Sequence, residues 1–182
     1  TMMFENEFLL IGHSERTTEH AIKSLAKVVL EKGLVKHVVQ VNIPYDRSCM
    51  HIDTVFTRIN HDHVVAFKPM IYDGISSNVE MFSHDGSKKT YPSLKDFILA
   101  EINPNMKFIF SGGGESPYQE REQWTDGCNL VAIKPGVALT YDRNPITEQA
   151  FRDIGYEVIH ATEFLEQFKA GKLDPSTIEN TI

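Results

Sequence analysis

Residues 8–43 of the chain read FLLIGHSERTTEHAIKSLAKVVLEKGLVKHVVQVNI, and they predict a strand, a helix and a second strand. Phe8–Gly12 is a short apolar run of the length that is typical of a buried strand. Ser14 or Thr17 is expected to cap the helix and Gly33 to end it. The helix itself is predicted by apolar residues that recur on one face: Ala21, Ile22, Leu25, Ala26, Val28 and Val29.

The rest of the chain continues this mixture of strands and helices. Expected strands are Val38–Ile43, His51–Asn60, Val64–Met70, Val79–Phe82, Lys89–Tyr91, Lys107–Phe110, Asn129–Ile133, Val137–Tyr141 and Glu157–Ala161. Expected helices run from Pro92 to Ile102, Pro145 to Ile154 and Thr162 to Gly171. Hairpins and helices recur in a ββαβ order, unlike the strict alternation of a doubly wound sheet. We therefore expect an α/β fold over residues 1–182, with no internal domain boundary.

The composition is that of an ordinary globular protein, with 182 residues, 41% hydrophobic and 24% charged. No apolar run reaches the roughly 20 residues that span a bilayer, so no membrane partner is expected. The 18 Lys+Arg against 25 Asp+Glu give a net charge of −7, which argues against nucleic acid as a partner, because phosphate contacts need clustered cations. Cys49 and Cys128 are too few for a disulfide scaffold, although free thiols and a single bridge both stay open. Without a secretory signal in Thr1–Glu7, we expect a cytoplasmic protein.

One cluster of reactive residue types lies in Cys49-Met-His-Ile-Asp53. In an extended strand, Cys49, His51 and Asp53 would share one face. An imidazole shuttles protons near neutral pH, and a carboxylate binds a guanidinium through two parallel hydrogen bonds. The alternative is the solvated face of a half-buried strand.

A second cluster, Ser14-Glu-Arg-Thr17, follows the first predicted strand directly. An arginine in such a loop binds a carboxylate bidentately, which makes Arg16 a candidate ligand for a substrate. Taken alone, the segment is better explained as a helix cap, with Ser14 or Thr17 capping and Arg16 on the surface.

For three other motifs we expect no catalytic or ligand-binding role. Ser111-Gly-Gly-Gly114 lacks the ending of a phosphate-binding loop and predicts a tight backbone turn. Arg121–Gly127, which contains the only tryptophan, predicts a loop fixed by buried hydrogen bonds. His61 and His63 lie in a predicted turn without the four spaced ligands of a structural zinc site, so we predict no metal.

Four motifs occur in the order LIGHSERT (10–17), MHIDTVFT (50–57), REQWTDG (121–127) and YDRN (141–144). This series resembles the arginine deiminase family, within the guanidino-group-modifying (amidinotransferase) superfamily, from about Phe8 to Ala161. The resemblance implies a five-bladed α/β propeller, the pentein fold, built of ββαβ modules. About three blades would be present in this chain.

The resemblance also implies hydrolysis of L-arginine to L-citrulline and ammonia, a step of arginine catabolism, without metal or cofactor. In the family a cysteine thiolate attacks the guanidinium carbon and forms a thiouronium adduct. A histidine protonates the departing ammonia and then activates water. By position, His51 matches that histidine, Asp53 a guanidinium-binding carboxylate that we count with the catalytic residues, and Arg16 the arginine that binds the substrate's α-carboxylate.

The chain also departs from the family pattern. The family nucleophile lies in a Gly/Arg-rich loop near the C-terminus, and no residue of this chain matches it; Cys49 and Cys128 are elsewhere. An expected Glu-Gly-Gly-Asp motif would lie ahead of Thr1. We therefore expect a fragment truncated at both ends, inactive alone, that forms a homo-oligomer or self-associates. Alternatives are a non-catalytic relative that binds a guanidino compound, a propeller piece completed by another chain, and a related substrate such as agmatine.

Overall fold

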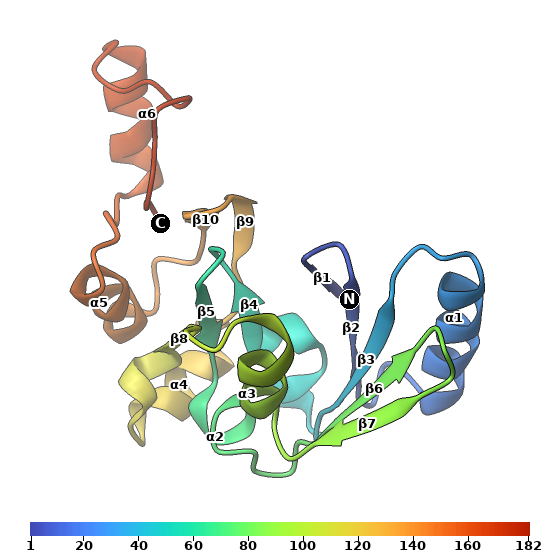
Figure 1. The fold of residues 1–182 in the computed structure, drawn as a ribbon. Coiled ribbons are helices and arrows are strands. Elements are labelled where there is room, and N and C mark those ends of the chain that lie inside the picture. Colours follow the sequence, from blue (N-terminus) through green and yellow to red (C-terminus); the bar gives the residue numbers. More distant parts are fainter.

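The computed structural model describes residues 1–182 as an α/β protein with three separate β-sheets (Figure 1). The strands are β1 Met2–Phe4, β2 Phe8–His13, β3 His37–Asn42, β4 Phe56–Arg58, β5 His63–Ala66, β6 Val79–Ser83, β7 Lys88–Tyr91, β8 Lys107–Phe110, β9 Val131–Lys134 and β10 Val137–Leu139. The α-helices are α1 Glu19–Glu31, α2 Lys68–Ile71, α3 Leu94–Phe97, α4 Tyr118–Trp124, α5 Pro145–Asp153 and α6 Ala161–Lys169. Short 3-10 helices cover η1 Arg47–Cys49, η2 Ile52–Thr54 and η4 Ser111–Gly114, and the π-helix η3 Ile98–Ile102 continues α3.

The strand pairing repeats one connection, in which an antiparallel hairpin is followed by helix and then by a parallel strand. The hairpin β1–β2 is followed by α1 and by β3, which runs parallel to β2. The hairpin β4–β5 is followed, after an insertion, by β8 parallel to β5. The hairpin β9–β10 is followed by α5, α6 and an isolated parallel bridge between Val137 and Thr181. The α/β class is confirmed, whereas no sheet closes and the five-bladed propeller stays a prediction.

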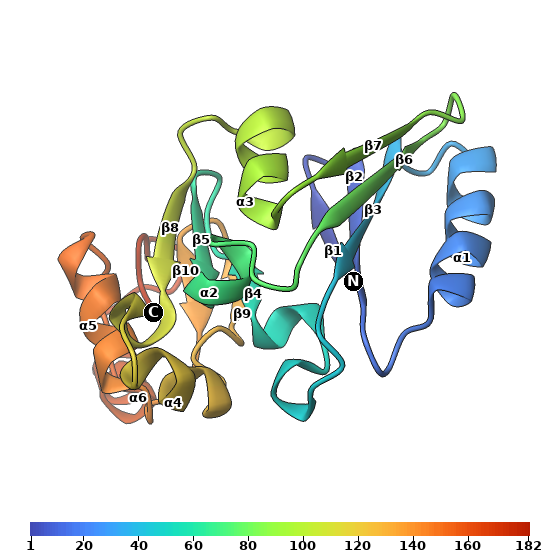
Figure 2. The same ribbon diagram turned by 90° about the horizontal axis from the view of Figure 1, so that it is seen from below.

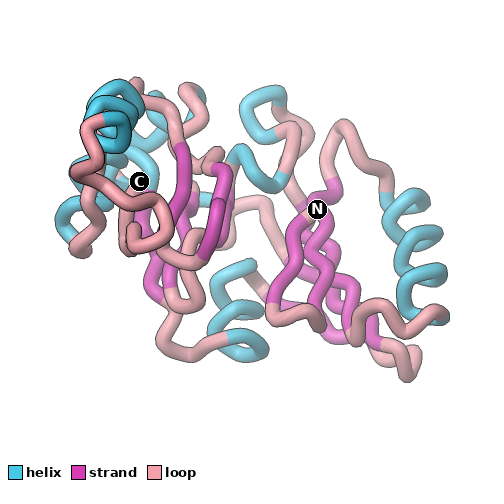
Figure 3. Tube along the Cα trace, turned by 90° about the horizontal axis from the view of Figure 1, so that it is seen from above, coloured by secondary structure: helices cyan, strands magenta, loops and turns pink.

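The hairpin β6–β7 belongs to the five-stranded sheet, although its sequence is inserted between two strands of the three-stranded sheet. It lies between β5 and β8 in the sequence, yet β6 pairs antiparallel with β3 and gives the sheet order β1-β2-β3-β6-β7. Figure 2 shows α3 between this sheet and the sheet of β4, β5 and β8, and Figure 3 shows the same two groups of strands from the other side. The largest hydrophobic cluster fills this space and includes Leu10, Phe56 and Phe97. The two sheets therefore share one core.

Helix α1 covers the outer face of the first sheet. Ile22 and Ala26 are its buried residues, and they pack with Ile11 and Val38. The predicted cap was wrong: Thr18 is the N-cap, and its hydroxyl accepts a hydrogen bond from the amide of Ala21 at 3.2 Å. By contrast α6 buries no residue, and no helix of the structure has the length and apolar character needed to cross a membrane.

Three expected strands differ from the structure. The predicted strand His51–Asn60 is wrong over its first half, because η2 occupies Ile52–Thr54 and only Phe56–Arg58 is extended. The predicted strand Val64–Met70 ends at Ala66, where Pro69 cannot donate to a ladder and α2 begins. Glu157–Ala161 forms no strand, only one bridge from Glu157 to Thr181.

The predicted loop Arg121–Gly127 is also wrong in part, because Arg121–Trp124 belongs to α4. A helix of seven residues is too short to produce a clear apolar period. The predicted tight turn at Ser111–Gly114 is confirmed, since Gly112, Gly113 and Gly114 all have positive φ. A Cβ on Gly112 would lie 2.3 Å from the carbonyl oxygen of Tyr118, so only glycine fits where α4 begins.

Candidate active site

A pocket of about 220 Å³ lies between the first turns of α1 and the segment that carries His51 and Asp53. Both of these predicted site residues line it, together with Thr17 and Met50. Its apolar wall consists of Ile11, Ala21, Ile22, Leu25 and Ile52. The pocket therefore combines an imidazole, a carboxylate and an aliphatic surface.

The segment from Arg47 to Thr54 folds as two 3-10 turns rather than as a strand. The Asp46 carboxylate accepts hydrogen bonds from the amide and hydroxyl of Ser48 at 2.8 and 2.7 Å, and this caps η1. The Thr54 hydroxyl donates to the carbonyl of His51 at 2.6 Å and stabilises η2. Such local side-chain bonds compete with a strand ladder, which explains why the extended prediction failed.

These turns separate Cys49 from the other two residues of its motif. His51 and Asp53 are exposed, whereas Cys49 is 5% exposed and belongs to the main core. Ile52 is buried between them and packs close to Gly12, where a Cβ would lie 3.3 Å from the Cβ of Ile52. The shared face predicted for Cys49, His51 and Asp53 is therefore wrong for the thiol.

The loop Ser14–Thr17 holds Arg16 next to this segment. Ser14 and Thr17 exchange backbone hydrogen bonds of 3.2 and 3.3 Å, which fixes a tight turn. The buried Ser14 hydroxyl donates to the carbonyl oxygen of Met50 at 2.6 Å. The half-exposed Arg16 guanidinium donates to the Met50 sulfur at 3.3 Å and pairs with Glu15 at 3.3 Å. Arg16 thus contacts the neighbour of His51, although it does not line the pocket itself.

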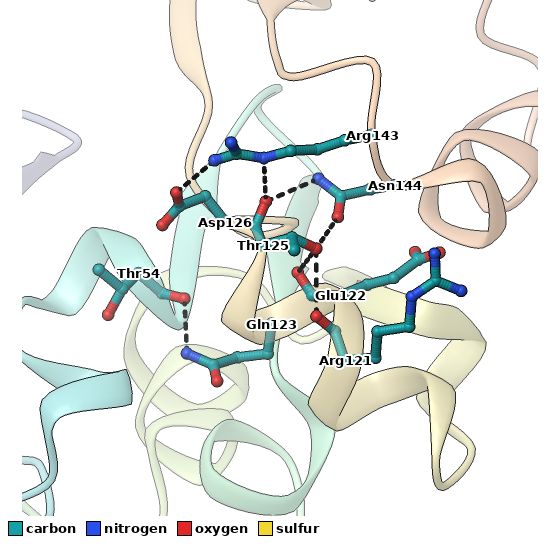
Figure 4. A network of polar contacts seen from close by, with 8 residues as sticks. All are labelled: Thr54, Arg121, Glu122, Gln123, Thr125, Asp126, Arg143 and Asn144. Carbon is teal, nitrogen blue, oxygen red and sulfur yellow. Dashed lines mark hydrogen bonds and ion pairs between the residues drawn. The ribbon is translucent and has the colours of Figure 1, made fainter.

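Helix α4 supports the same segment from the core side (Figure 4). The side-chain nitrogen (Nε2) of Gln123 donates to the backbone carbonyl oxygens of Ser48 at 2.5 Å and Thr54 at 3.4 Å. The fully buried Glu122 accepts hydrogen bonds from the amides of Ile146 and Thr147, at 3.0 and 2.8 Å, at the start of α5. The sequence prediction of buried hydrogen bonds in this region is confirmed, but the contact from Gln123 to the His51 segment has no local sequence signal.

Neither cysteine has the environment of an activated nucleophile. Both cysteines are free and buried in the structure. Of the two possibilities that the sequence left open, free thiols or a single disulfide, the structure shows free thiols. Burial raises the pKa of Cys128 to about 12, against a weaker opposite effect of a hydrogen bond with Ser111. Burial also raises the pKa of Cys49, although a hydrogen bond with Ser48 opposes it. Nucleophilic cysteines instead have a lowered pKa and partial exposure.

The other histidines of the central region are not arranged around a common centre. His61 is exposed, and the His63 ring packs edge-on against Tyr156 with ring centroids 5.8 Å apart. The structure places no group of three or more His, Cys, Asp or Glu residues where they could hold a metal ion.

Known proteins resemble this chain along most of its length. The family profile described as arginine deiminase matches residues 1–163. The arginine deiminase of Staphylococcus haemolyticus is 35% identical over 172 residues, which are 88% of this chain and 41% of that protein. That of Limosilactobacillus reuteri is 35% identical over 161 residues, 85% of this chain and 39% of that protein.

Arginine deiminase 1 of Staphylococcus epidermidis is 37% identical over 169 residues, 88% of this chain and 41% of that protein. The chain therefore spans about two fifths of the length of these curated relatives. The match of the family profile runs through all four sequence motifs and through every residue of the pocket. The chain belongs to the arginine deiminase family.

Proposed function

We propose that this chain carries part of the active site of an arginine deiminase, which hydrolyses L-arginine to L-citrulline and ammonia. In that reaction the oxygen of water replaces one terminal nitrogen of the guanidinium group. The observation that carries the proposal is the placement of His51 and Asp53 on one pocket wall, with Arg16 held against Met50 beside it. The membership of the family supports the same reaction.

Each of the three residues has a role that suits its chemistry. Asp53 binds the guanidinium nitrogens through charge-assisted hydrogen bonds. Arg16 binds the α-carboxylate of the substrate, for which its planar guanidinium is suited. His51 gives a proton to the departing ammonia and then takes one from the attacking water, because an imidazole exchanges protons near neutral pH. The apolar wall of the pocket accommodates the methylene chain of arginine.

In the family reaction a cysteine thiolate adds to the guanidinium carbon, and the C–N bond to ammonia breaks to leave a thiouronium adduct. Water then adds to the same carbon and releases the thiolate. We propose that neither thiol of this chain takes that role, because both are buried with a raised pKa. The 182 residues alone should bind arginine without hydrolysing it.

We further propose that the three hairpin–helix–strand units are blades of a five-bladed propeller. The order of antiparallel hairpin, helix and parallel strand in the first two units, with an isolated parallel bridge in place of the strand in the third, supports this arrangement. The remaining blades and the nucleophile would come from sequence that corresponds to the unmatched part of the relatives, on the same or another chain.

Isothermal calorimetry of the 182-residue chain tests the ligand. We expect heat with L-arginine, loss of most of it in Asp53→Asn, and no change in the matched variant Asp73→Asn, whose exposed carboxylate lies outside the pocket. Agmatine, which lacks the carboxylate, should bind about tenfold or more weakly than arginine to the wild type. In Arg16→Gln the two ligands should bind alike. Equal binding of arginine by wild type and Asp53→Asn would refute the assignment of Asp53.

A further inference from the structure

A buried side-chain amide from α4 contacts both ends of the segment that carries His51 and Asp53. Gln123 is 4% exposed, and its side-chain nitrogen lies 2.5 Å from the carbonyl oxygen of Ser48 and 3.4 Å from that of Thr54. These two carbonyls bracket the turns on which His51 and Asp53 stand. One side chain therefore fixes the distance between the ends of the segment.

The helix that presents Gln123 is itself firmly held. Next to it, the Glu122 carboxylate accepts the Thr147 amide at 2.8 Å and the Thr147 hydroxyl at 2.7 Å. The Thr125 hydroxyl donates to the side chain of Asn144 at 2.6 Å, and Arg143 donates to the Thr125 carbonyl at 3.0 Å (Figure 4). These bonds attach α4 to the start of α5. The backbone that carries Gln123 is therefore held in place.

A second contact, from another part of the chain, holds the middle of the segment. The Ser14 hydroxyl, from the loop that carries Arg16, donates to the carbonyl of Met50 at 2.6 Å. The segment is therefore fixed at Ser48, Met50 and Thr54 by side chains from two different elements. Neither His51 nor Asp53 has a side-chain hydrogen bond of its own within the chain, so their positions depend on these backbone contacts.

We infer that Gln123 is a positioning residue for the arginine site: it holds the Ser48–Thr54 backbone so that His51 and Asp53 face the pocket together. This inference rests on the proposed function for the identity of the ligand. The geometric part of the inference, that Gln123 fixes the segment, does not depend on arginine.

The main variant is Gln123→Met, which keeps the volume of the side chain and removes its donor. Hydrogen exchange by NMR should show faster exchange, by about tenfold, at the amides of Cys49, Thr54 and Val55, while the amides of β2 and β3 are unchanged. The matched control is Gln149→Met on α5, where the side chain is exposed and bonds only to Asp153 at 2.7 Å. The carbon-13 resonances of the His51 ring should shift in Gln123→Met and stay in place in the control.

Arginine titration separates this inference from the proposed function. If the wild type binds arginine, Gln123→Met should weaken binding by about tenfold and the control should not. If the wild type does not bind, the proposed ligand is wrong, and the exchange data still decide the role of Gln123. Unchanged exchange at Cys49, Thr54 and Val55 in a folded Gln123→Met would overturn the inference.

A measurement on the wild type covers the case in which Gln123→Met does not fold. The side-chain amide protons of Gln123 should exchange at least about tenfold more slowly than those of Gln149, because only the former are buried and bonded to two carbonyls. Equal rates would mean that the contacts to Ser48 and Thr54 do not exist in solution, and would overturn the inference.

Discussion

At the scale of single residues, both thiols of the chain are buried. Cys49 is 5% exposed and Cys128 fully buried, and burial raises the pKa of both. The thiolate is the reactive form, so a raised pKa and restricted access act in the same direction. Both cysteines therefore lie in the core, where burial opposes formation of the thiolate.

We predict that neither thiol reacts with a disulfide reagent in the native protein near pH 7, and that both react once the chain is unfolded in guanidinium chloride. On long incubation of the native protein, any slow reaction through local opening should occur at Cys49 before Cys128, because Cys128 is the more deeply buried and its pKa is raised to about 12. A spectrophotometric thiol assay with and without denaturant measures this. A fast native reaction at Cys49 would restore it as a candidate nucleophile, which turnover by wild type but not by Cys49→Ala would establish.

The segment Cys49–Asp53 shows which parts of the site could be predicted from the sequence. The resemblance of four ordered motifs to a known family assigned a site to His51, Asp53 and Arg16; in the structure His51 and Asp53 line one pocket, and Arg16 contacts Met50 beside it. Alternation along a strand placed Cys49 with them, and this failed because Asp46 and Thr54 fold the segment into 3-10 turns. The contact of Gln123 with this segment could not be predicted from the sequence, because Gln123 and Ser48 are 75 positions apart.

At the scale of elements, the start of α1 depends on one hydroxyl. Thr18, rather than Ser14 or Thr17, accepts the hydrogen bond of an orphan amide in the first turn. Three candidate caps within five residues cannot be told apart by residue type alone. The choice depends on the Ser14–Thr17 turn, whose backbone bonds place Thr17 outside the helix.

We predict that Thr18→Ala lowers the free energy of unfolding by about 1 kcal/mol. Thr17→Ala is the matched control, because the Thr17 side chain caps nothing, and its effect should stay within about 0.5 kcal/mol. Urea unfolding followed by circular dichroism measures both variants. A larger loss in Thr17→Ala than in Thr18→Ala would contradict the observed cap.

Two side chains of strand β7, Lys89 and Tyr91, bind the carboxylate of Glu101 on the π-helix η3. The Lys89 ammonium lies 2.5 Å from the Glu101 carboxylate, and the Tyr91 hydroxyl donates to the same oxygen. These hydrogen bonds, that of Lys89 first, hold the pKa of Glu101 below its ordinary value of 4.5. A lowered carboxyl pKa in the folded state stabilises the protein above the unfolded pKa, and this part of the stability is lost as pH falls through the folded pKa.

We predict that Glu101→Gln is less stable than wild type at pH 7, and that the difference shrinks as the pH is lowered below about 4. Glu166→Gln on α6 is the control, because Glu166 is exposed and forms no ion pair. Chemical unfolding of the three proteins across this pH range measures the effect. A difference that grows with acidity would show that the sign of the Glu101 contribution is wrong.

At the scale of the whole molecule, the hairpin β9–β10 leaves large apolar side chains uncovered. Val131, Ile133 and Leu139 are each 61% exposed, and the hairpin forms a two-stranded sheet of its own. An isolated two-stranded sheet is only marginally stable in water, and exposed strand edges are templates for pairing with another chain. The α/β class and the hairpin–helix–strand order could be predicted from local patterns, but this exposure follows from sheets that do not close.

We predict that the 182-residue chain self-associates through this hairpin. Sedimentation velocity should show a species heavier than the 20.7 kDa monomer whose share grows with concentration. Replacing Val131 and Ile133 by lysine should shift the equilibrium to the monomer, because charges at the contact must be desolvated on pairing. The matched control replaces Leu34 and Ile75 by lysine, since these are equally exposed, at 63% and 60%, but lie outside β-strands. A wild type that stays monomeric at all concentrations, or a control that dissociates as much as the hairpin variant, would rule out the hairpin as the contact.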